Sequence, residues 1–351
     1  MSSSTRTGIV YDDRYLLHET GKHPERKERL KSVMSYLEEK KVLEKLELIK
    51  PRKATVEEIE FVHTRNYIEK VENYCAKGYN ALDMDTVICK DSYEVGLLSA
   101  GGALTAVDKV MKEELDNVFV LARPPGHHAE PGRGMGFCLF NNAAIAARYA
   151  MKEYNVERVL IVDWDVHHGN GTELIFYNDP GVLFFSVHQS PAYPGTGAAD
   201  EVGASKGKGH TINVPLPSCS GDDDYELIFR EILVPLCHEY KPQMVIVSSG
   251  YDAHHNDPLA EMVLSSQAYG MMAGIVKKIA NKHCGGKVVL LLEGGYSLNA
   301  LGESVFNVLN TLAGWGMISN KSEGKILPKL STRTNIHIVK SVHKGYWSIF
   351  G

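Results

Sequence analysis

The sequence lacks the features that mark secreted, membrane-spanning and nucleic-acid-binding proteins. None of its 6 cysteines belongs to a C-x-x-C pair, and no apolar run opens the chain as in a signal peptide, so we expect a reducing, cytoplasmic setting. No apolar segment approaches the roughly 20 residues needed to cross a bilayer. No dense Lys/Arg run accompanies the formal net charge of -5. We therefore expect neither a membrane nor a nucleic acid as a partner.

Linkers, internal repeats and low-complexity tracts are also missing. The 351 residues, 44% of them hydrophobic, suit one large α/β domain or two smaller ones with a substantial core. Because nothing divides the chain, we predict one domain over residues 1–351.

Short apolar runs rich in β-branched residues are predicted to be strands. They are NVFVLA from Asn117, VLIVD from Val159, VLFFSVH from Val182, MVIVSSG from Met244 and KVVLLLEGG from Lys287. Near-continuous apolar runs are typical of strands covered on both faces. Helical periodicity alternates with them over residues 93–112, 141–154, 223–240, 265–281 and 298–312. This alternation predicts an α/β fold with a doubly wound, mostly parallel sheet and helices on both faces.

The end of the sequence predicts one more helix. In STRTNIHIVKSVHKGYW, a helical conformation would place four residues on one apolar face, namely Ile336, Val339, Val342 and Tyr346. We expect this helix to dock on the rest of the fold.

Polar segments follow four of the predicted strands. They are RPPGHHAE after the first, DWDVHHGNGT after the run at Val159, GYDAHH after the run at Met244, and EGGYS after the last. In an open parallel sheet, ligands bind beyond the carboxyl ends of the strands. We therefore expect these four segments to meet at one edge of the sheet.

The segment DWDVHH predicts a metal site. Side chains alternate along a strand, so Asp163, Asp165 and His167 should point to one face. Aspartate oxygen and histidine nitrogen both suit zinc, and a catalytic zinc site needs three protein ligands and one open position. Asp252, at the tip of another strand, is expected to supply a third ligand. The alternative is a strand cap and turn, with GNG supplying the turn geometry.

His127, His128 and Tyr296 are candidates for catalytic groups. Histidine titrates near neutrality, so the histidine pair behind the Pro-Pro-Gly turn can move protons. A solvated loop is the alternative for this pair. Tyr296 follows two glycines, and its phenol either donates to developing charge on a substrate oxygen or fills the core.

Taken together, the motifs resemble those of the histone deacetylase family, the arginase-fold zinc deacylases. The resemblance is strongest to class II members and to bacterial histone deacetylase-like amidohydrolases and acetylpolyamine amidohydrolases. It extends over nearly the whole chain, through RPPGHHAEPGRGMGFCLFNNAAIAA, VDWDVHHGNGT, YPGTG, SSGYDAHHNDPL and LLEGGYSL. It implies an arginase-like, deacetylase-like fold and the hydrolysis of an N-acyl amide.

The resemblance also implies a role for each motif residue. The zinc ligands would be Asp165, His167 and Asp252. His128 would be the general base that takes a proton from the attacking water and then passes one to the departing amine. His127, hydrogen-bonded to Asp163, would be its electrostatic partner. Tyr296 and the zinc would together polarise the acyl carbonyl and stabilise the oxyanion.

The family further implies a structural alkali-cation site beside the zinc, in which we expect potassium. Its side-chain or backbone ligands would be Asp163, Asp165, His167, Ser186 and Val187. One position departs from class I members, because Asn170 stands where they have a second aspartate, as in class II members. An amide can fix the tautomer of His128 but supplies no counter-charge for its imidazolium.

A tunnel for a linear alkyl stem is implied as well. Gly136, Phe137 and Tyr193 match positions where the family flanks this tunnel with two aromatic rings. The alternative is that these aromatics belong to the core. Leu259 occupies a rim position where polyamine-selective relatives of the eukaryotic kind have a glutamate, and an apolar residue there favours an acyl-lysine side chain.

Two further assignments depend on looser matches. Asp83 and Asp85 lie where the family has a rim carboxylate that binds substrate amides, and a solvated turn is the alternative. Arg29 matches an arginine near an inner channel, although Glu25 and Arg29 are also spaced as an ordinary helical charge pair.

We therefore expect a zinc-dependent deacylase that acts on acyl-lysine in proteins or peptides. An acetylpolyamine amidohydrolase, acting on an acylated polyamine, is the nearest enzymatic alternative. A catalytically weak module that binds acyl-lysine is the second, but every catalytic position is filled, Tyr296 included. The sequence is compatible with a homo-oligomer, and it does not separate zinc from iron as the metal in the cell.

Overall fold

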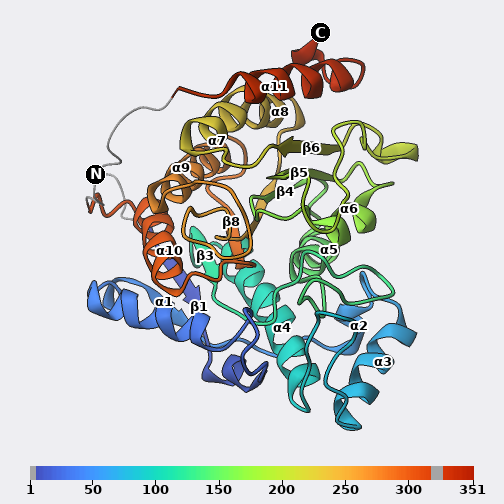
Figure 1. Ribbon diagram of the computed structural model, residues 1–351, viewed down its shortest axis with the longest axis vertical. Helices are drawn as coiled ribbons and strands as arrows, with labels where there is room; N and C mark the ends of the chain where they lie inside the picture. Colours follow the sequence, from blue (N-terminus) through green and yellow to red (C-terminus); the bar gives the residue numbers. More distant parts are fainter. Residues whose placement is uncertain (1–4, 318–326) are drawn as a thin grey trace.

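The computed structural model describes residues 5–317 and 327–351, and a parallel sheet runs through its centre (Figure 1). Its strands are β1 (Thr7–Val10), β2 (Glu47–Ile49), β3 (Asn117–Val120), β4 (Val159–Asp163), β5 (Val182–Gln189), β6 (Thr211–Leu216), β7 (Met244–Ser249) and β8 (Val288–Leu292). The order across the sheet is β2-β1-β3-β8-β7-β4-β5-β6. All neighbouring strands are parallel, which confirms the predicted fold class.

The sequence prediction found five of the six inner strands, β3, β4, β5, β7 and β8, and missed β1 and the two edge strands. β1 and β2 contain only 4 and 3 residues, too few to show a period. β6 is an edge strand of sequence TINVPL. Its polar residues and its proline are tolerated at an edge but weaken the apolar signal.

Helices cover both faces of the sheet. They are α1 (Glu28–Glu39), α2 (Val56–Ile59), α3 (Arg65–Ala76), α4 (Ser92–Met111), α5 (Asn142–Tyr154), α6 (Asn170–Phe176), α7 (Asp222–Ile228), α8 (Val234–Tyr240), α9 (Ser266–His283), α10 (Leu298–Ala313) and α11 (Leu330–His343). Helices α4 and α5 lie on one face, and α1, α10 and α9 lie on the other (Figure 1). No helix in the described ranges combines the length and the apolar character needed to cross a membrane.

The predicted helix over residues 223–240 is interrupted. A π-helical turn, Phe229–Leu233, separates α7 from α8. Pro235 lies at the start of α8, and because proline has no backbone N–H, it cannot continue the α-helical hydrogen-bond ladder.

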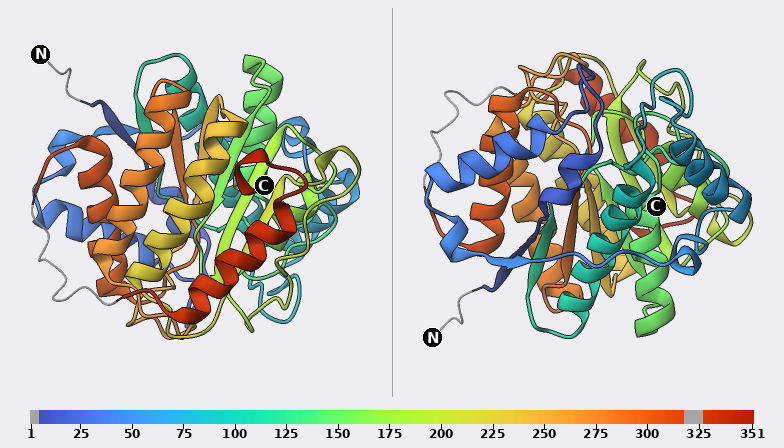
Figure 2. Two further views of the ribbon diagram at one scale, coloured as in Figure 1. Left: turned by 90° about the horizontal axis from the view of Figure 1, so that it is seen from above. Right: turned by 90° about the horizontal axis from the view of Figure 1, so that it is seen from below.

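The terminal helix α11 docks on the edge strand β6, as predicted (Figure 2). Ile336 and Val339 are buried in this contact. The prediction was wrong about Tyr346, because the helix ends at His343 and the Tyr346 side chain is 41% exposed. Trp347 is buried instead, and its indole N–H donates to the Gly209 carbonyl at 2.7 Å.

The four polar segments singled out in the sequence follow β3, β8, β7 and β4. These strands are consecutive in the sheet. Because parallel strands end at the same edge, all four segments meet there. The sheet thus positions the site that the sequence predicted.

Candidate metal centre and catalytic pocket

Three potential metal ligands converge beyond the carboxyl ends of β4 and β7. They are Asp165, His167 and Asp252, and one ligand atom from each lies within 4.8 Å of the other two. Asp165 and Asp252 are buried, whereas 14% of the His167 side chain is exposed. The three predicted residues therefore come together, and His167 is the one that solvent can reach.

Glycine backbones make room for the two carboxylates. A Cβ atom on Gly250 would lie 2.0 Å from Asp165 Oδ2, and one on Gly294 would lie 2.1 Å from Asp252 Oδ2. Real Cβ atoms do not approach so closely, so larger residues would displace both ligands. These glycines, at the ends of β7 and β8, are thus part of the site.

The donor set fits a divalent cation. Asp252 Oδ2 is buried without a hydrogen-bond partner, although it lies 3.2 Å from His167 Nδ1. Burial by itself would lower the pKa of His167, but Asp165 and Asp252 raise it to about 10. The two carboxylates therefore favour positive charge at this point, and an ion with oxygen and nitrogen ligands would supply it.

The route by which these side chains converge differs from the predicted one. β4 ends at Asp163, so Asp165 and His167 lie in a loop and not on a strand. The Asp165 N–H donates to Asp163 Oδ1 at 3.1 Å, and the His167 N–H donates to Asp165 Oδ1 at 2.9 Å. These local hydrogen bonds keep Asp165 and His167 on the same side of the loop, the arrangement that a strand was expected to provide. Trp164 points the other way, into the core.

The pKa values of the two adjacent histidines are shifted in opposite directions. His127 Nδ1 lies 3.0 Å from Asp163 Oδ2. Burial alone would lower the pKa of His127, but Asp163 and Asp165 raise it to about 10. For His128, burial together with the charges of His127 and His167 holds the pKa well below its ordinary value. His128 is therefore the neutral member, ready to accept a proton.

Asn170 orients His128. Its Oδ1 lies 2.8 Å from His128 Nδ1, while its amide nitrogen donates to Glu130 Oε1 at 2.9 Å. Because Glu130 takes the amide donor, the amide oxygen faces the imidazole and accepts the Nδ1 proton. The lone pair of His128 therefore lies on Nε2.

Arg29 supports the turn before Tyr296. Its Nε donates to the Gly295 carbonyl at 2.7 Å and its Nη2 to the Glu293 carbonyl at 2.5 Å. The guanidinium carbon lies 5.0 Å from the centre of the Tyr296 ring. Arg29 is fully buried, and its ion pair with Glu25, at 3.1 Å, is buried too. The surface position considered from the sequence is thus excluded, because the ion pair of Arg29 with Glu25 is buried.

Two buried carboxylates near Tyr296 were not predicted. Asp257 Oδ2 accepts the backbone N–H groups of Tyr296 and Ser297 at 2.6 and 3.2 Å. Glu293 Oε2 accepts those of Gly126 and His127 at 2.7 and 3.1 Å. Burial raises the pKa of each carboxyl to about 7. Both lie within the quoted motifs, in HHNDPL and LLEGGYS, but only the fold shows that they hold catalytic loops.

A cavity of about 230 Å³ opens above the three potential ligands. Its walls include Asp85, His127, His128, Gly136, Phe137, His167, Tyr193, Leu259 and Tyr296. The Phe137 and Tyr296 ring centres are 5.8 Å apart, and those of Tyr193 and His128 are 5.1 Å apart. Tyr193 and Leu259 are each 40% exposed, so they stand at the mouth, and the core placement of these aromatics is excluded.

The two rim aspartates have different places. Asp83 is exposed, and its Oδ1 accepts the backbone N–H groups of Asp85 and Thr86 at 3.2 and 2.8 Å. Asp85 lines the cavity, and burial, together with the charge of Asp83, raises its pKa. Asp83 therefore makes the solvated turn, and Asp85 is the carboxylate that faces the cavity.

The residues assigned to the alkali-cation site also lie together. Asp163 of β4 and Ser186 of β5 are direct partners in the sheet register, and Val187 follows in β5. All three are fully buried. The Ser186 hydroxyl lies 2.9 Å from His188 Nδ1.

Known proteins are similar to this chain in sequence and in fold. A family model described as histone deacetylase domain matches residues 23–312. A probable deacetylase of Archaeoglobus fulgidus is 42% identical, and the alignment covers 98% of this chain and 99% of that protein. A histone deacetylase-like amidohydrolase of Pseudomonas aeruginosa is 38% identical, with 83% and 82% covered. The crystal structure of the HDA15 HD domain matches with a TM-score of 0.91 at 34% identity, covering 99% of this chain and 96% of that one. The chain belongs to the histone deacetylase family.

Proposed function

We propose that this protein is a zinc-dependent deacylase that removes acetyl or other short acyl groups from lysine side chains of proteins or peptides, and that it acts as one catalytic domain. The observation that carries the proposal is that His128, Tyr296 and the potential ligand His167 all line the same cavity. Membership of the deacetylase family supports the same reaction. A cytoplasmic location stays our prediction.

Asp165, His167 and Asp252 would hold the zinc ion. A zinc ion there would act as a Lewis acid toward the acyl carbonyl and lower the pKa of a water molecule. The opening between these residues and the cavity leaves room for a substrate oxygen. For potassium we assign Asp163, Asp165, His167, Ser186 and Val187, of which Asp163 and Ser186 are register partners.

The chain's own residues move the protons. His128 accepts a proton from the attacking water through Nε2, because its Nδ1 faces Asn170. It then gives a proton to the departing lysine amine. His127 stays protonated beside Asp163, and burial together with the positive charge of His127 keeps the pKa of His128 low.

Tyr296 stabilises the developing oxyanion. Burial raises the pKa of its phenol well above the ordinary value, so the phenol keeps its proton and can donate it in a hydrogen bond. Arg29 and Asp257 hold the backbone on either side of this residue.

The cavity walls favour an acyl-lysine. Phe137 and Tyr193 line the passage along which four methylenes would lie, and Leu259 gives its mouth an apolar residue. Asp85 in the same wall would bind a backbone amide of a peptide. An acylated polyamine is the competing substrate, favoured by the negative charge of Asp85. A module that only binds acyl-lysine would not need Tyr296.

The choice between the two substrates is tested by steady-state hydrolysis. We expect a higher kcat/KM for an acetyl-lysine peptide than for N-acetylputrescine. A preference for the diamine by a factor of about a hundred, roughly 2.7 kcal/mol of differential transition-state binding, would replace lysine by polyamine in the proposal.

Removal of one potential ligand tests the metal site. In Asp252→Ala we expect zinc affinity to fall by at least about a hundredfold. Even mutation of residues that only hydrogen-bond to metal ligands typically lowers metal affinity by about tenfold to a hundredfold. Equilibrium dialysis followed by elemental analysis gives the affinity. Tyr296→Phe is the control that should bind zinc like the wild type. Equal affinity in Asp252→Ala would remove Asp252 from the site.

The pH profile tests the pairing of His128 with Asn170. In Asn170→Asp, a carboxylate beside His128 favours the imidazolium, so the pKa of His128 rises and less of the base is neutral at a given pH. We expect the acidic limb of the pH profile of kcat/KM to move upward by about one unit. The exposed Asn73→Asp serves as a control. An unmoved limb would contradict the assignment of His128 as the base.

Loss of the phenol tests Tyr296. We expect Tyr296→Phe to lower kcat by about a hundredfold or more, the usual effect of deleting one oxyanion donor, while the protein still folds and binds zinc. Tyr79→Phe, at a side chain that is 52% exposed, is the control. An unchanged kcat would refute the proposed role.

A further inference from the structure

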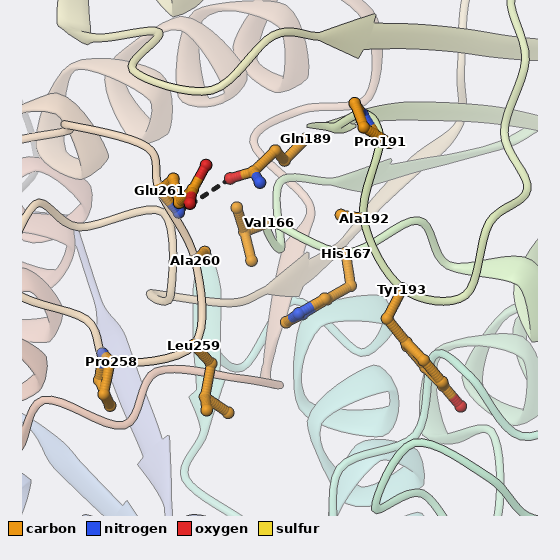
Figure 3. A pocket seen from close by; sticks show the side chains of 10 residues that line it. All are labelled: Val166, His167, Gln189, Pro191, Ala192, Tyr193, Pro258, Leu259, Ala260 and Glu261. Carbon is orange, nitrogen blue, oxygen red and sulfur yellow. Dashed lines mark hydrogen bonds between the residues drawn. The ribbon is translucent and has the colours of Figure 1, made fainter.

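A second cavity, of about 400 Å³, lies beside the catalytic one. It is open to solvent and lies between the end of β5 with the loop that follows, residues 189–193, and a second loop, residues 258–261 (Figure 3). His167, Tyr193 and Leu259 line both cavities. A substrate whose acyl group reaches the catalytic cavity therefore has its remaining atoms at the entrance of the second one.

Glu261 brings a negative charge to this second cavity. Among the described residues that line it, Glu261 is the one carboxylate, and none is a lysine or an arginine. Figure 3 shows Glu261 and Gln189 together at one end and the His167 imidazole nearer the other. The cavity therefore has the charge that suits a cation.

The position of Glu261 is built by the fold. Its backbone N–H donates to Gln189 Oε1 at 2.9 Å, and its carbonyl accepts the Cys219 N–H at 2.7 Å. These bonds pin the backbone on both sides. Within the described ranges, no ion pair involves the Glu261 carboxylate, so its charge is available to a ligand.

From this arrangement we infer that the second cavity binds a positively charged group of the substrate, an ammonium or guanidinium, through Glu261. The inference rests on the proposed function, because the cation must belong to a molecule whose acyl-amine occupies the catalytic cavity. In an extended peptide, residues two positions apart point to the same face and start about 7 Å from each other. A lysine or arginine near the acyl-lysine can thus reach the neighbouring cavity.

The test uses acetyl-lysine peptides in which one residue at a time, within two positions of the acetyl-lysine, is Arg, Gln or Glu. For the wild type we expect kcat/KM at one such position to be about fivefold higher with Arg than with Gln, the size of a partly exposed ion pair. Glu should be worse than Gln. High salt should reduce the ratio, because ions screen exposed charges.

Glu261→Gln is the decisive variant. It keeps the backbone bonds to Gln189 and Cys219 and removes only the charge, so the ratio of Arg to Gln peptide should fall to about one. Glu44→Gln is the matched control. Glu44 is exposed and lies just before the amino end of β2, whereas both cavities lie beyond the carboxyl ends of the strands. In this control the fivefold ratio should persist.

A parallel arm compares N-acetylspermidine with N-acetylputrescine in the same two variants. An effect of Glu261→Gln in the peptide arm assigns the cation to a neighbouring basic side chain, and an effect confined to the polyamine arm assigns it to a distal amine. Hydrolysis in which neither arm responds to Glu261→Gln overturns the inference and leaves the proposed function intact. Absence of hydrolysis in both arms overturns the proposed function and, with it, the inference.

Discussion

The buried carboxylates of Asp165 and Asp252 are the constraint on which the rest of the site depends. Two like charges inside a protein are unfavourable unless positive charge and hydrogen-bond donors compensate them. Both residues are fully buried or nearly so, and Asp252 keeps one oxygen without a hydrogen-bond partner. A cation held by Asp165, His167 and Asp252 would satisfy this demand.

Backbone N–H groups satisfy at least one oxygen of each buried carboxylate around the site. Asp163, Asp165 and Asp252 each accept an N–H from the short loop after β4. Glu293 and Asp257 do the same for the loops that carry His127 and Tyr296. Buried carboxylates, whose desolvation is unfavourable, therefore fix the conformation of the loops that carry the site residues.

The difference between His127 and His128 follows from their partners. A carboxylate faces the Nδ1 atom of the first, and an amide oxygen faces that of the second. Charge therefore collects on His127, and its field keeps His128 neutral. This separation of two identical residues is what a proton-transfer site requires, since one must hold a proton while the other accepts one.

Sequence alone determined the fold class, five of the six inner strands and the clustering of Asp165, His167 and Asp252, because buried strands produce long apolar runs and the candidate metal ligands follow them as polar motifs. It also indicated His127, His128 and Tyr296. Tertiary structure decided the rest. The sequence did not show that Arg29 is buried, that Asp85 and not Asp83 lines the cavity, or that Tyr193 stands at the cavity mouth and not in the core. These placements depend on segments that are distant in the sequence and adjacent in the fold. Glu293 and Asp257 hold loops far away in the chain, and the backbone of Glu261 is held by Gln189 and Cys219. Such contacts leave no local period or spacing in the sequence.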